Sequence, residues 1–396
     1  MSLISRFFLT CQIFVLYKYL HSDVQIIWVW CLYATSTEHQ LDAACVLSEP
    51  SDVRDPEYAV DMAAVTDVNA SSELESWMGN LPEELHNVPI NHLAIPGSHD
   101  SCSYTISPQA EIAPDNEYYG NTLVKLLGPI GKQILYSWSV TQNITTKEQL
   151  RSGIRYFDLR VAVRNDPNDE NLYLIHGLFG AVVDNFLVEV KEFLESHRNE
   201  VILLHFQHFY NMTDTHHNRL LNKLTSAFGP LMCQFTTDIG NITLASLWRR
   251  GYQMITFYAH EKLAKYHPYL WPTSYIPNPW PDDDDATRLV TFWNRTLQQG
   301  RDPKKFFVLQ GVGTPQASTV TMHICNSLRV YIAPKINAAL ESWLSNQTPG
   351  SGAHTCNVVM CDFVEMNEHR IPKMVVEMNH KLLLENVSES LGEEMV

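Results

Sequence analysis

Hydrophobic positions downstream of residue 75 follow two alternating patterns. Seven short apolar runs have the length and residue types of buried strands. They are His92–Ile95, Arg155–Val163, Leu172–Ile175, Val201–Phe206, Gln253–Tyr258, Phe306–Gln310 and Asn357–Phe363. Between them, apolar residues recur with a period near 3.6, which predicts helices at Val182–His197, His217–Phe228 and Val330–Leu344. Buried strands that alternate with helices are typical of a parallel sheet.

This pattern predicts an α/β fold, namely a distorted TIM-type (β/α) barrel with one strand missed or irregular. Such barrels run to about 250 residues, which the chain accommodates. A doubly wound open sheet is the alternative, and it is disfavoured because no Gly-x-Gly-x-x-Gly follows any of the strands. No helical crossover is recognisable between the first two strands, across Ser103–Thr146.

The first 75 residues differ from the rest and are expected to lie outside the barrel. Phe7–Tyr17 and Val24–Tyr33 are apolar, but each is shorter than the roughly 20 residues needed to span a bilayer. A leader outside the fold is favoured over a membrane anchor or a cleaved signal peptide. Residues 35–75 are polar and have the composition of a linker. We therefore predict a hydrophobic leader and polar linker over 1–75 and a barrel domain over 76–390.

Composition narrows the function. Lys and Arg number 28 against 44 Asp and Glu, a formal charge of −16, which opposes binding to nucleic acids. Lipid or phosphate chemistry must then depend on a few local cations. The eight cysteines form no Cys-x-x-Cys pair, so a zinc module is not expected. Their dispersal favours a cytoplasmic protein, peripheral to membranes, although seven Asn-x-Ser/Thr sequons and residues 1–35 leave anchoring or secretion as the alternative.

Polar, reactive residues recur at the carboxyl ends of the predicted strands. In a barrel these ends meet at one mouth, where catalytic groups lie. The residues are His99, Asp100, Asp158, Arg160, His176, Gln207, His208 and Asp362. Each alone is compatible with a turn, an ion pair or a helix cap. Together, two histidines can serve as acid and base, an arginine can hold a phosphate, and a carboxylate can orient a histidine. These parts suit cleavage of a phosphodiester.

Three segments in order carry a family resemblance. Pro96–Ser101, Gly153–Arg160 and Ile175–Gly177 resemble the X-box of phosphatidylinositol-specific phospholipase C. Among its branches, the chain most resembles the eukaryotic X domain-containing proteins with a single barrel, and further segments at Trp138–Gln142, Leu270–Pro272 and Asn357–Phe363 support this. The resemblance covers residues 75–385, with the X-box core over about 88–260.

The resemblance implies a phosphoric diester hydrolase of phospholipase C type. His99 would be the general base that removes the proton of the inositol 2-hydroxyl. His176 would be the general acid that protonates the departing diacylglycerol oxygen. Arg160 would contact the phosphate, and Asp362 would orient His99. The product would be a cyclic inositol phosphate.

The same resemblance implies a site with no metal and no other cofactor. Large signalling phospholipases C bind calcium through an Asn after the first histidine and a Glu-x-Asp pair on the second strand. This chain has Asp100 and Asp158-x-Arg160 at those positions. A guanidinium would take the place of the cation, with Asp100 and Asp158 holding it, so calcium-independent activity is expected.

The chain departs from bacterial relatives where these use basic residues to hold the substrate, at the ends of the fourth and fifth strands. Here the candidates are Gln207, His208 and Tyr258, with Phe257 expected in the pocket wall. The expected partner is a phospholipid at a membrane surface, with no obligate protein partner. Another glycerophospholipid as substrate, or a catalytically weak headgroup-binding protein, remains the alternative.

An apolar, Pro-interrupted loop spans residues 271–280, including Trp271, Tyr275 and Trp280. Trp and Tyr favour the membrane interface, so the loop is expected either to insert there or to serve as a packed lid of the barrel.

Overall fold

One curled sheet organises the residues that the structure, a computed structural model, describes, which are 73–384. Its strands are β1 (Ile95–Ser98), β2 (Tyr156–Ala162), β3 (Tyr173–His176), β4 (Leu178–Val182), β5 (Ile202–Tyr210), β6 (Met254–Tyr258), β7 (Leu270–Pro272), β8 (Val308–Gly311) and β9 (Val358–Cys361). The parallel strands follow the order β7-β6-β5-β2-β1-β9-β8. The predicted α/β, TIM-like fold is thus confirmed. The leader and residues 385–390 lie outside the described residues, so the domain boundaries stay predictions.

The two edge strands of this sheet, β7 and β8, are not paired with each other. An irregular segment that follows β7 connects the two edges by hydrogen bonds. The amide of Phe306 donates to the carbonyl of Tyr275 at 2.9 Å, and that of Val308 donates to Pro277 at 2.9 Å. Proline cannot donate to a ladder, so Pro277 and Pro279 keep this segment from forming a regular strand. This irregular segment stands where the predicted barrel has its missing or irregular strand.

The segment Leu172–Ile175 is not a parallel barrel strand, contrary to the sequence-based prediction. β3 pairs antiparallel with β2 and with β4, and both lie off the main path of the sheet. The connection over 163–172 explains the difference, because parallel strands need a crossover of about a dozen residues or more. The short strands β4 and β7 were not predicted.

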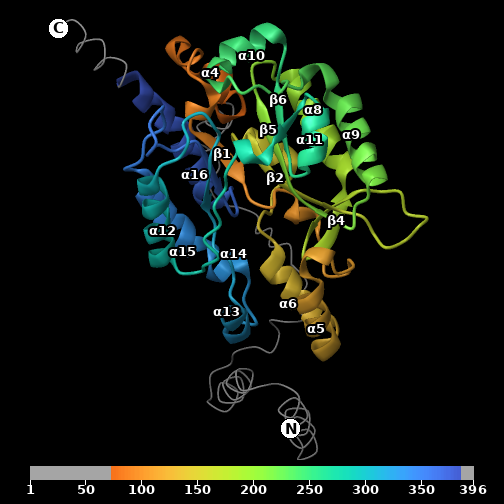
Figure 1. Cartoon of the computed structure of the whole chain (residues 1–396). Helices are drawn as coiled ribbons and strands as arrows, with labels where there is room; N and C mark the ends of the chain where they lie inside the picture. The colour runs from red at the N-terminus through yellow and green to blue at the C-terminus, as the bar shows by residue number, and fades with distance from the viewer. Residues whose placement is uncertain (1–72, 385–396) are drawn as a thin grey trace, which may run out of the picture.

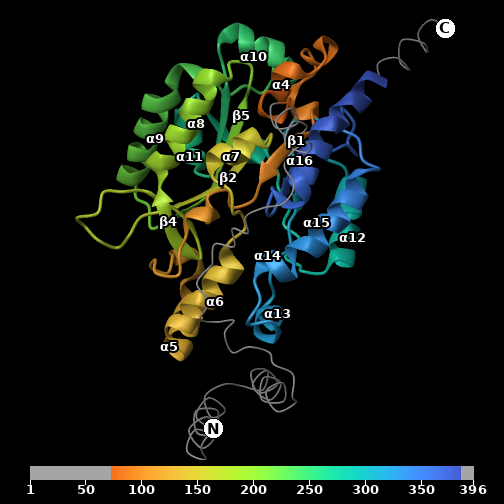
Figure 2. The same cartoon turned by 180° about the vertical axis from the view of Figure 1, so that it is seen from behind.

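Helices cover the outside of the sheet (Figures 1 and 2). They are α4 (Trp77–Asn80), α5 (Glu117–Leu127), α6 (Pro129–Ser139), α7 (Thr146–Arg151), α8 (Val183–Ser196), α9 (Asp214–Phe228), α10 (Leu244–Arg250), α11 (Glu261–Tyr266), α12 (Ala286–Gln299), α13 (Ala317–Met322), α14 (Leu328–Tyr331), α15 (Ala333–Leu344) and α16 (Met366–Glu377). The three predicted helices are confirmed as α8, α9 and α14–α15. Helices α5 to α7 occupy the connection in which no crossover was recognised. Within 73–384, none of the helices has the length and apolarity needed to cross a bilayer.

The strand alternation divides the core into two layers. Tyr156, Phe257 and Trp271 belong to the cluster inside the curl of the sheet. Their neighbours Phe157 and Tyr258 face the other way and pack beneath the helices. In both views α4 and α10 lie at one end of the sheet, and α5, α6 and α13 lie at the other (Figures 1 and 2). The chain reaches α5 and α6 after β1, and α13 after β8.

A buried ion pair stabilises the amino-terminal end of the sheet. Arg155 and Glu200 are 0% and 1% exposed, with Nη2 and Oε2 separated by 2.7 Å. Arg155 also donates to the carbonyls of Leu150 and Glu75. Glu200 accepts from the amide of Gly79 at 3.0 Å. The pair therefore connects the α4 segment to the barrel.

Candidate active site

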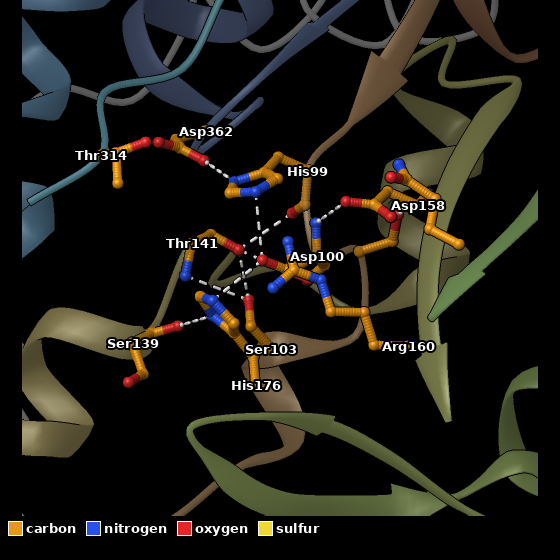
Figure 3. Close-up of polar contacts among 12 residues, drawn as sticks. His99, Asp100, Ser103, Ser139, Thr141, Asp158, Arg160, His176, Thr314 and Asp362 are labelled. Carbon is orange, nitrogen blue, oxygen red and sulfur yellow. Dashed lines mark hydrogen bonds and ion pairs between the residues drawn. The ribbon is translucent and has the colours of Figure 1, made fainter. Parts of the chain in front are cut away.

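The carboxylate of Asp100, two residues after the end of β1, contacts the other reactive groups of the mouth (Figure 3). Its Oδ2 lies 3.1 Å from His99 Nε2 and 3.0 Å from His176 Nε2, and its Oδ1 lies 2.6 Å from Arg160 Nε. Burial of Asp100 raises the pKa of the carboxyl, but the guanidinium and the two imidazoles outweigh burial and hold this pKa well below its usual range. Asp100 is thus an anion with three cationic or proton-donating neighbours.

His99 lies between two carboxylates. Its Nδ1 is 2.8 Å from Asp362 Oδ1, on the residue that follows β9, while Nε2 faces Asp100. Burial lowers the pKa of His99, but Asp100 and Asp362 together raise it to about 9. The backbone of His99 is fixed as well, because its carbonyl accepts from Thr141 Oγ1 at 2.9 Å and from Gln142 Nε2 at 3.1 Å.

His176 reaches the same carboxylate from the β3–β4 hairpin. Its Nδ1 lies 2.6 Å from the carbonyl of Ser139, the last residue of α6. The carbonyl accepts a hydrogen bond, so Nδ1 donates to it and the ring is oriented with Nε2 toward Asp100. Its ring centroid lies 6.0 Å from that of His99.

Arg160 and Asp158 complete the cluster from one face of β2. Burial of Arg160 lowers the pKa of the guanidinium, but Asp100 outweighs burial and raises it. Asp158 Oδ2 accepts from the amide of Asp100 at 3.2 Å, and burial together with Asp100 raises the pKa of this carboxyl. Within residues 73–384 the two terminal nitrogens of Arg160 make no hydrogen bond to protein, which leaves them available for an anion.

The donor atoms of His99, Asp100 and Asp158 lie within 4.8 Å of one another, as metal ligands do. Calcium takes six to eight oxygen ligands, whereas this cluster offers two carboxylates and an imidazole. Asp100 is moreover engaged by Arg160. These residues do not fit a calcium site, and calcium-independent activity stays a prediction.

The predicted contacts on β5 lie beside Arg160. The β2–β5 register shifts at this point, so that Leu159 pairs with Phe206 and Arg160 pairs with His208, leaving Gln207 as the extra residue. Bulges of this kind redirect side chains near active sites. The Gln207 side chain accepts from Asn278 Nδ2 at 2.7 Å. Partial burial lowers the pKa of His208, and Arg160 lowers it further.

Tyr258 does not reach the mouth, in contrast to the prediction. It is fully buried on the helix-facing side of the sheet, where its hydroxyl lies 2.8 Å from His217 Nδ1. Strand residues alternate between faces, so its neighbour Phe257 takes the inward position expected for a wall. Trp271 is buried as well and donates to the carbonyl of Cys233, and it is therefore not an inserting residue.

Sequence reasoning gave no role to the residues that hold the two histidines from behind. Ser139 positions His176, and Thr141 and Gln142 position His99. The amide of Gly177 donates to Asp115 Oδ2 at 2.9 Å, which fixes the hairpin turn. The Trp138–Gln142 segment was a signal for the first three, since it was recognised as part of the resemblance.

Comparison with curated proteins places this arrangement in a family. The chain is 38% identical to PI-PLC X domain-containing protein 2 of Mus musculus over 306 residues, which cover 77% of this chain and 88% of that protein. It belongs to the PI-PLC X domain-containing protein family. It is also 37% identical to PI-PLC X domain-containing protein 3 of Homo sapiens (75% and 91% covered) and 32% identical to protein 1 of Homo sapiens (78% and 93% covered). The resemblance deduced from the sequence is confirmed. No protein-family model matches the chain.

Solved structures agree on the fold of this PI-PLC X domain-containing protein. Phosphatidylinositol-specific phospholipase C of Staphylococcus aureus superposes with a TM-score of 0.53 at 17% identity, covering 78% of this chain and 98% of that one. The enzyme of Listeria monocytogenes gives a TM-score of 0.53 at 18% identity, covering 77% and 98%. At such identity the likeness establishes the TIM-like fold alone.

Proposed function

We propose that this protein is a phosphoric diester hydrolase of phospholipase C type, which cleaves phosphatidylinositol-like glycerophospholipids at a membrane surface without a metal ion. One observation carries the proposal, namely that the Asp100 carboxylate contacts His99, His176 and Arg160 at once. An acid, a base and a phosphate-binding cation are thereby held around one small volume. Membership of the PI-PLC X domain-containing family supports the same reaction class.

In the first step, the terminal nitrogens of Arg160 bind the phosphate oxygens by charge-assisted hydrogen bonds. Neutral His99 removes the proton of the inositol 2-hydroxyl, whose oxygen then bonds to phosphorus. The bond from phosphorus to the diacylglycerol oxygen breaks, and His176 gives that oxygen a proton. The products are diacylglycerol and a cyclic inositol phosphate. Water opens the cyclic diester in a second step, with the two histidines in reversed roles.

The electrostatics of His99 determine its behaviour as a base. With a pKa of about 9, most His99 carries a proton at pH 7, held by Asp100 and Asp362. Only the neutral imidazole can accept the proton of the substrate hydroxyl. We therefore expect turnover to increase with pH across the neutral range.

The residues expected to contact the lipid headgroup do not distinguish phosphatidylinositol from related glycerophospholipids. Gln207 precedes His208, which pairs with Arg160, and its amide bonds to Asn278 and Tyr156. Bacterial relatives have a basic residue at this strand end, so phosphatidylinositol should be compared with other glycerophospholipids. A headgroup-binding protein without turnover is the second candidate, supported by this same departure.

The test is cleavage of phosphatidylinositol vesicles by the full chain, with excess chelator and with added calcium. Diacylglycerol and cyclic inositol phosphate should form at the same rate in both conditions and should be lost in His99→Ala. Turnover that needs calcium would refute the metal-independent mechanism. Headgroup binding without cleavage of any glycerophospholipid would favour the binding protein instead.

A further inference from the structure

Exposed apolar side chains gather at the end of the barrel that carries the site. Among the described side chains of residues 73–116 and 120–384, eight large apolar ones are at least 42% exposed, and five of them belong to segments at this end. These five, which we call the apolar rim, are Leu126 (42%), Ile130 (53%), Trp280 (58%), Met322 (60%) and Val330 (66%). The other three, Val188, Tyr266 and Leu384, lie on α8, on α11 and near the carboxyl end.

The rim segments project from the sheet on the same side. Helices α5 and α6 form a hairpin whose tip carries Leu126 and Ile130, and α13 and α14 carry Met322 and Val330. Both views show the hairpin and α13 extending beyond the carboxyl ends of the strands, away from α4 and α10 (Figures 1 and 2). This position leaves the rim beside the opening through which a substrate must enter.

The rim is connected to the site by packed side chains. Trp138 of α6 lies edge-on to Tyr331 of α14, with ring centroids 6.5 Å apart, and His323 stacks on Tyr331 at 3.7 Å. Helix α6 ends at Ser139, whose carbonyl holds His176. On the other side, Trp280 donates to Thr314 at 2.8 Å, and Thr314 lies beside Asp362 (Figure 3). The rim and the acid–base pair therefore share their supports.

Charge distinguishes these segments from the rest of this acidic chain. Residues 118–147 and 303–340 contain no Asp or Glu, although the chain has 44 such residues among 396. The first segment forms most of the α5–α6 hairpin, and the second includes all of α13 and α14. Lys125 is exposed next to Leu126 at the tip of the hairpin. Near the rim, carboxylates are present at Asp282–Asp285, which follow Trp280, and Asp284 accepts a hydrogen bond from Thr319 of α13. The exposed apolar side chains of segments 118–147 and 303–340, and not a net attraction of charge, therefore suit this surface to a bilayer.

We propose that the apolar rim seats the protein on a phospholipid bilayer, with Leu126, Ile130, Met322 and Val330 immersed below the headgroups. The inference rests on the proposed function in one respect, that the substrate is a lipid. Its acyl chains stay in the bilayer while its phosphate reaches Arg160, so the mouth must face the membrane during turnover. Transfer of one such side chain from water to an apolar medium strengthens binding by about tenfold or more.

The test uses the full chain carrying His99→Ala, so that no lipid is consumed during binding. Two rim variants, Leu126→Ser/Ile130→Ser and Met322→Ser/Val330→Ser, are compared with Val188→Ser/Tyr266→Ser, which removes equally exposed apolar side chains elsewhere. Sedimentation with vesicles of phosphatidylcholine and phosphatidylserine gives the affinity. Each rim variant should bind at least tenfold more weakly, and the control should bind like the parent chain.

A second measurement places the same substitutions in the chain that retains His99. Hydrolysis of phosphatidylinositol in vesicles should fall in parallel with binding, while hydrolysis of a monomeric short-chain analogue should not change. Rim variants that bind vesicles like the control, or a parent chain that binds no vesicles, would overturn the inference. Rim-dependent binding in a chain that cleaves no lipid would refute the proposed function and leave the rim intact.

Discussion

The Nε2 atoms of His99 and His176 contact the same oxygen, Oδ2 of Asp100, at 3.1 and 3.0 Å. Two imidazoles that meet at one anionic oxygen are also spaced to reach two oxygens of one phosphodiester. His99 has a second carboxylate, Asp362, behind it, whereas His176 has the carbonyl of Ser139. A carboxylate favours proton uptake by His99, and this difference is the basis for assigning base and acid.

Replacing either histidine should remove turnover and spare the fold. Both side chains are partly exposed at the mouth, at 16% and 21%, so truncation leaves the core intact. A general acid or base contributes about 10²–10⁴-fold, and His99→Ala and His176→Ala should each lose that much kcat. Thermal unfolding serves as the control for folding. A double variant that still cleaves phosphatidylinositol at the wild-type rate would contradict the site.

Arg160→Lys should also be damaging, even though the charge is kept. Nε of Arg160 holds Asp100, which leaves both terminal nitrogens for the phosphate. A lysine ammonium is a point charge and cannot serve both partners in a planar arrangement. Loss of one such interaction with the reacting phosphate costs about 10²-fold in kcat/KM. Wild-type kinetics in Arg160→Lys would show that phosphate is bound elsewhere.

The pH profile reports the two carboxylates around His99. Its pKa of about 9 means that the neutral base increases as pH rises toward 9, so kcat/KM should rise over the same range. Asp362→Asn removes one of the three negative charges, those of Asp100, Asp362 and Asp158, that raise this pKa. The rising limb should therefore shift to lower pH, and the plateau should fall because the ring loses a partner. A limb that stays in place would assign it to another group.

The sequence identified most of the site because strand ends converge. His99, Asp158, Arg160 and Asp362 follow from that rule. His176 reaches the mouth for a different reason, since it lies on an antiparallel hairpin that apolar patterns do not distinguish from a barrel strand.

Contacts that depend on strand register could not be predicted from the sequence by the same rule. A shift of one residue along a strand exchanges its inward and outward faces. The sequence did not determine which residue of β6 faces inward, so Tyr258 was wrongly predicted to reach the mouth. The bulge at Gln207, which brings His208 opposite Arg160, leaves no apolar signal. Backbone contacts such as that of Ser139 depend on how α6 packs against the hairpin, and local sequence does not encode this.

Gly177→Ala should reduce catalysis more than stability. Gly177 has a φ of 69°, and an added Cβ would overlap Oγ of Ser139 and lie 3.1 Å from its Cβ. Displacement of Ser139 would move the carbonyl that orients His176, so kcat should fall at least about tenfold with little change in KM. Gly251→Ala is the matched control, because Gly251 has a φ of 72° and nothing within 4 Å. It should show the same backbone strain with full activity. Equal activity in the two variants would contradict the positioning role of Ser139.

Glu200→Gln should destabilise the whole domain without touching the mouth. Arg155 and Glu200 are buried at the opposite end of the sheet, and loss of the carboxylate leaves a guanidinium without a counter-charge. Breaking one side of a buried pair costs about 3–5 kcal/mol in the free energy of unfolding. Urea unfolding should show this loss, while kcat of the folded fraction stays unchanged. Asp283→Asn, which breaks a pair with the exposed Arg288, is the control and should change stability little because water screens that pair. If both substitutions had the same small effect, burial of the Arg155–Glu200 pair would not govern the stability of this end of the barrel.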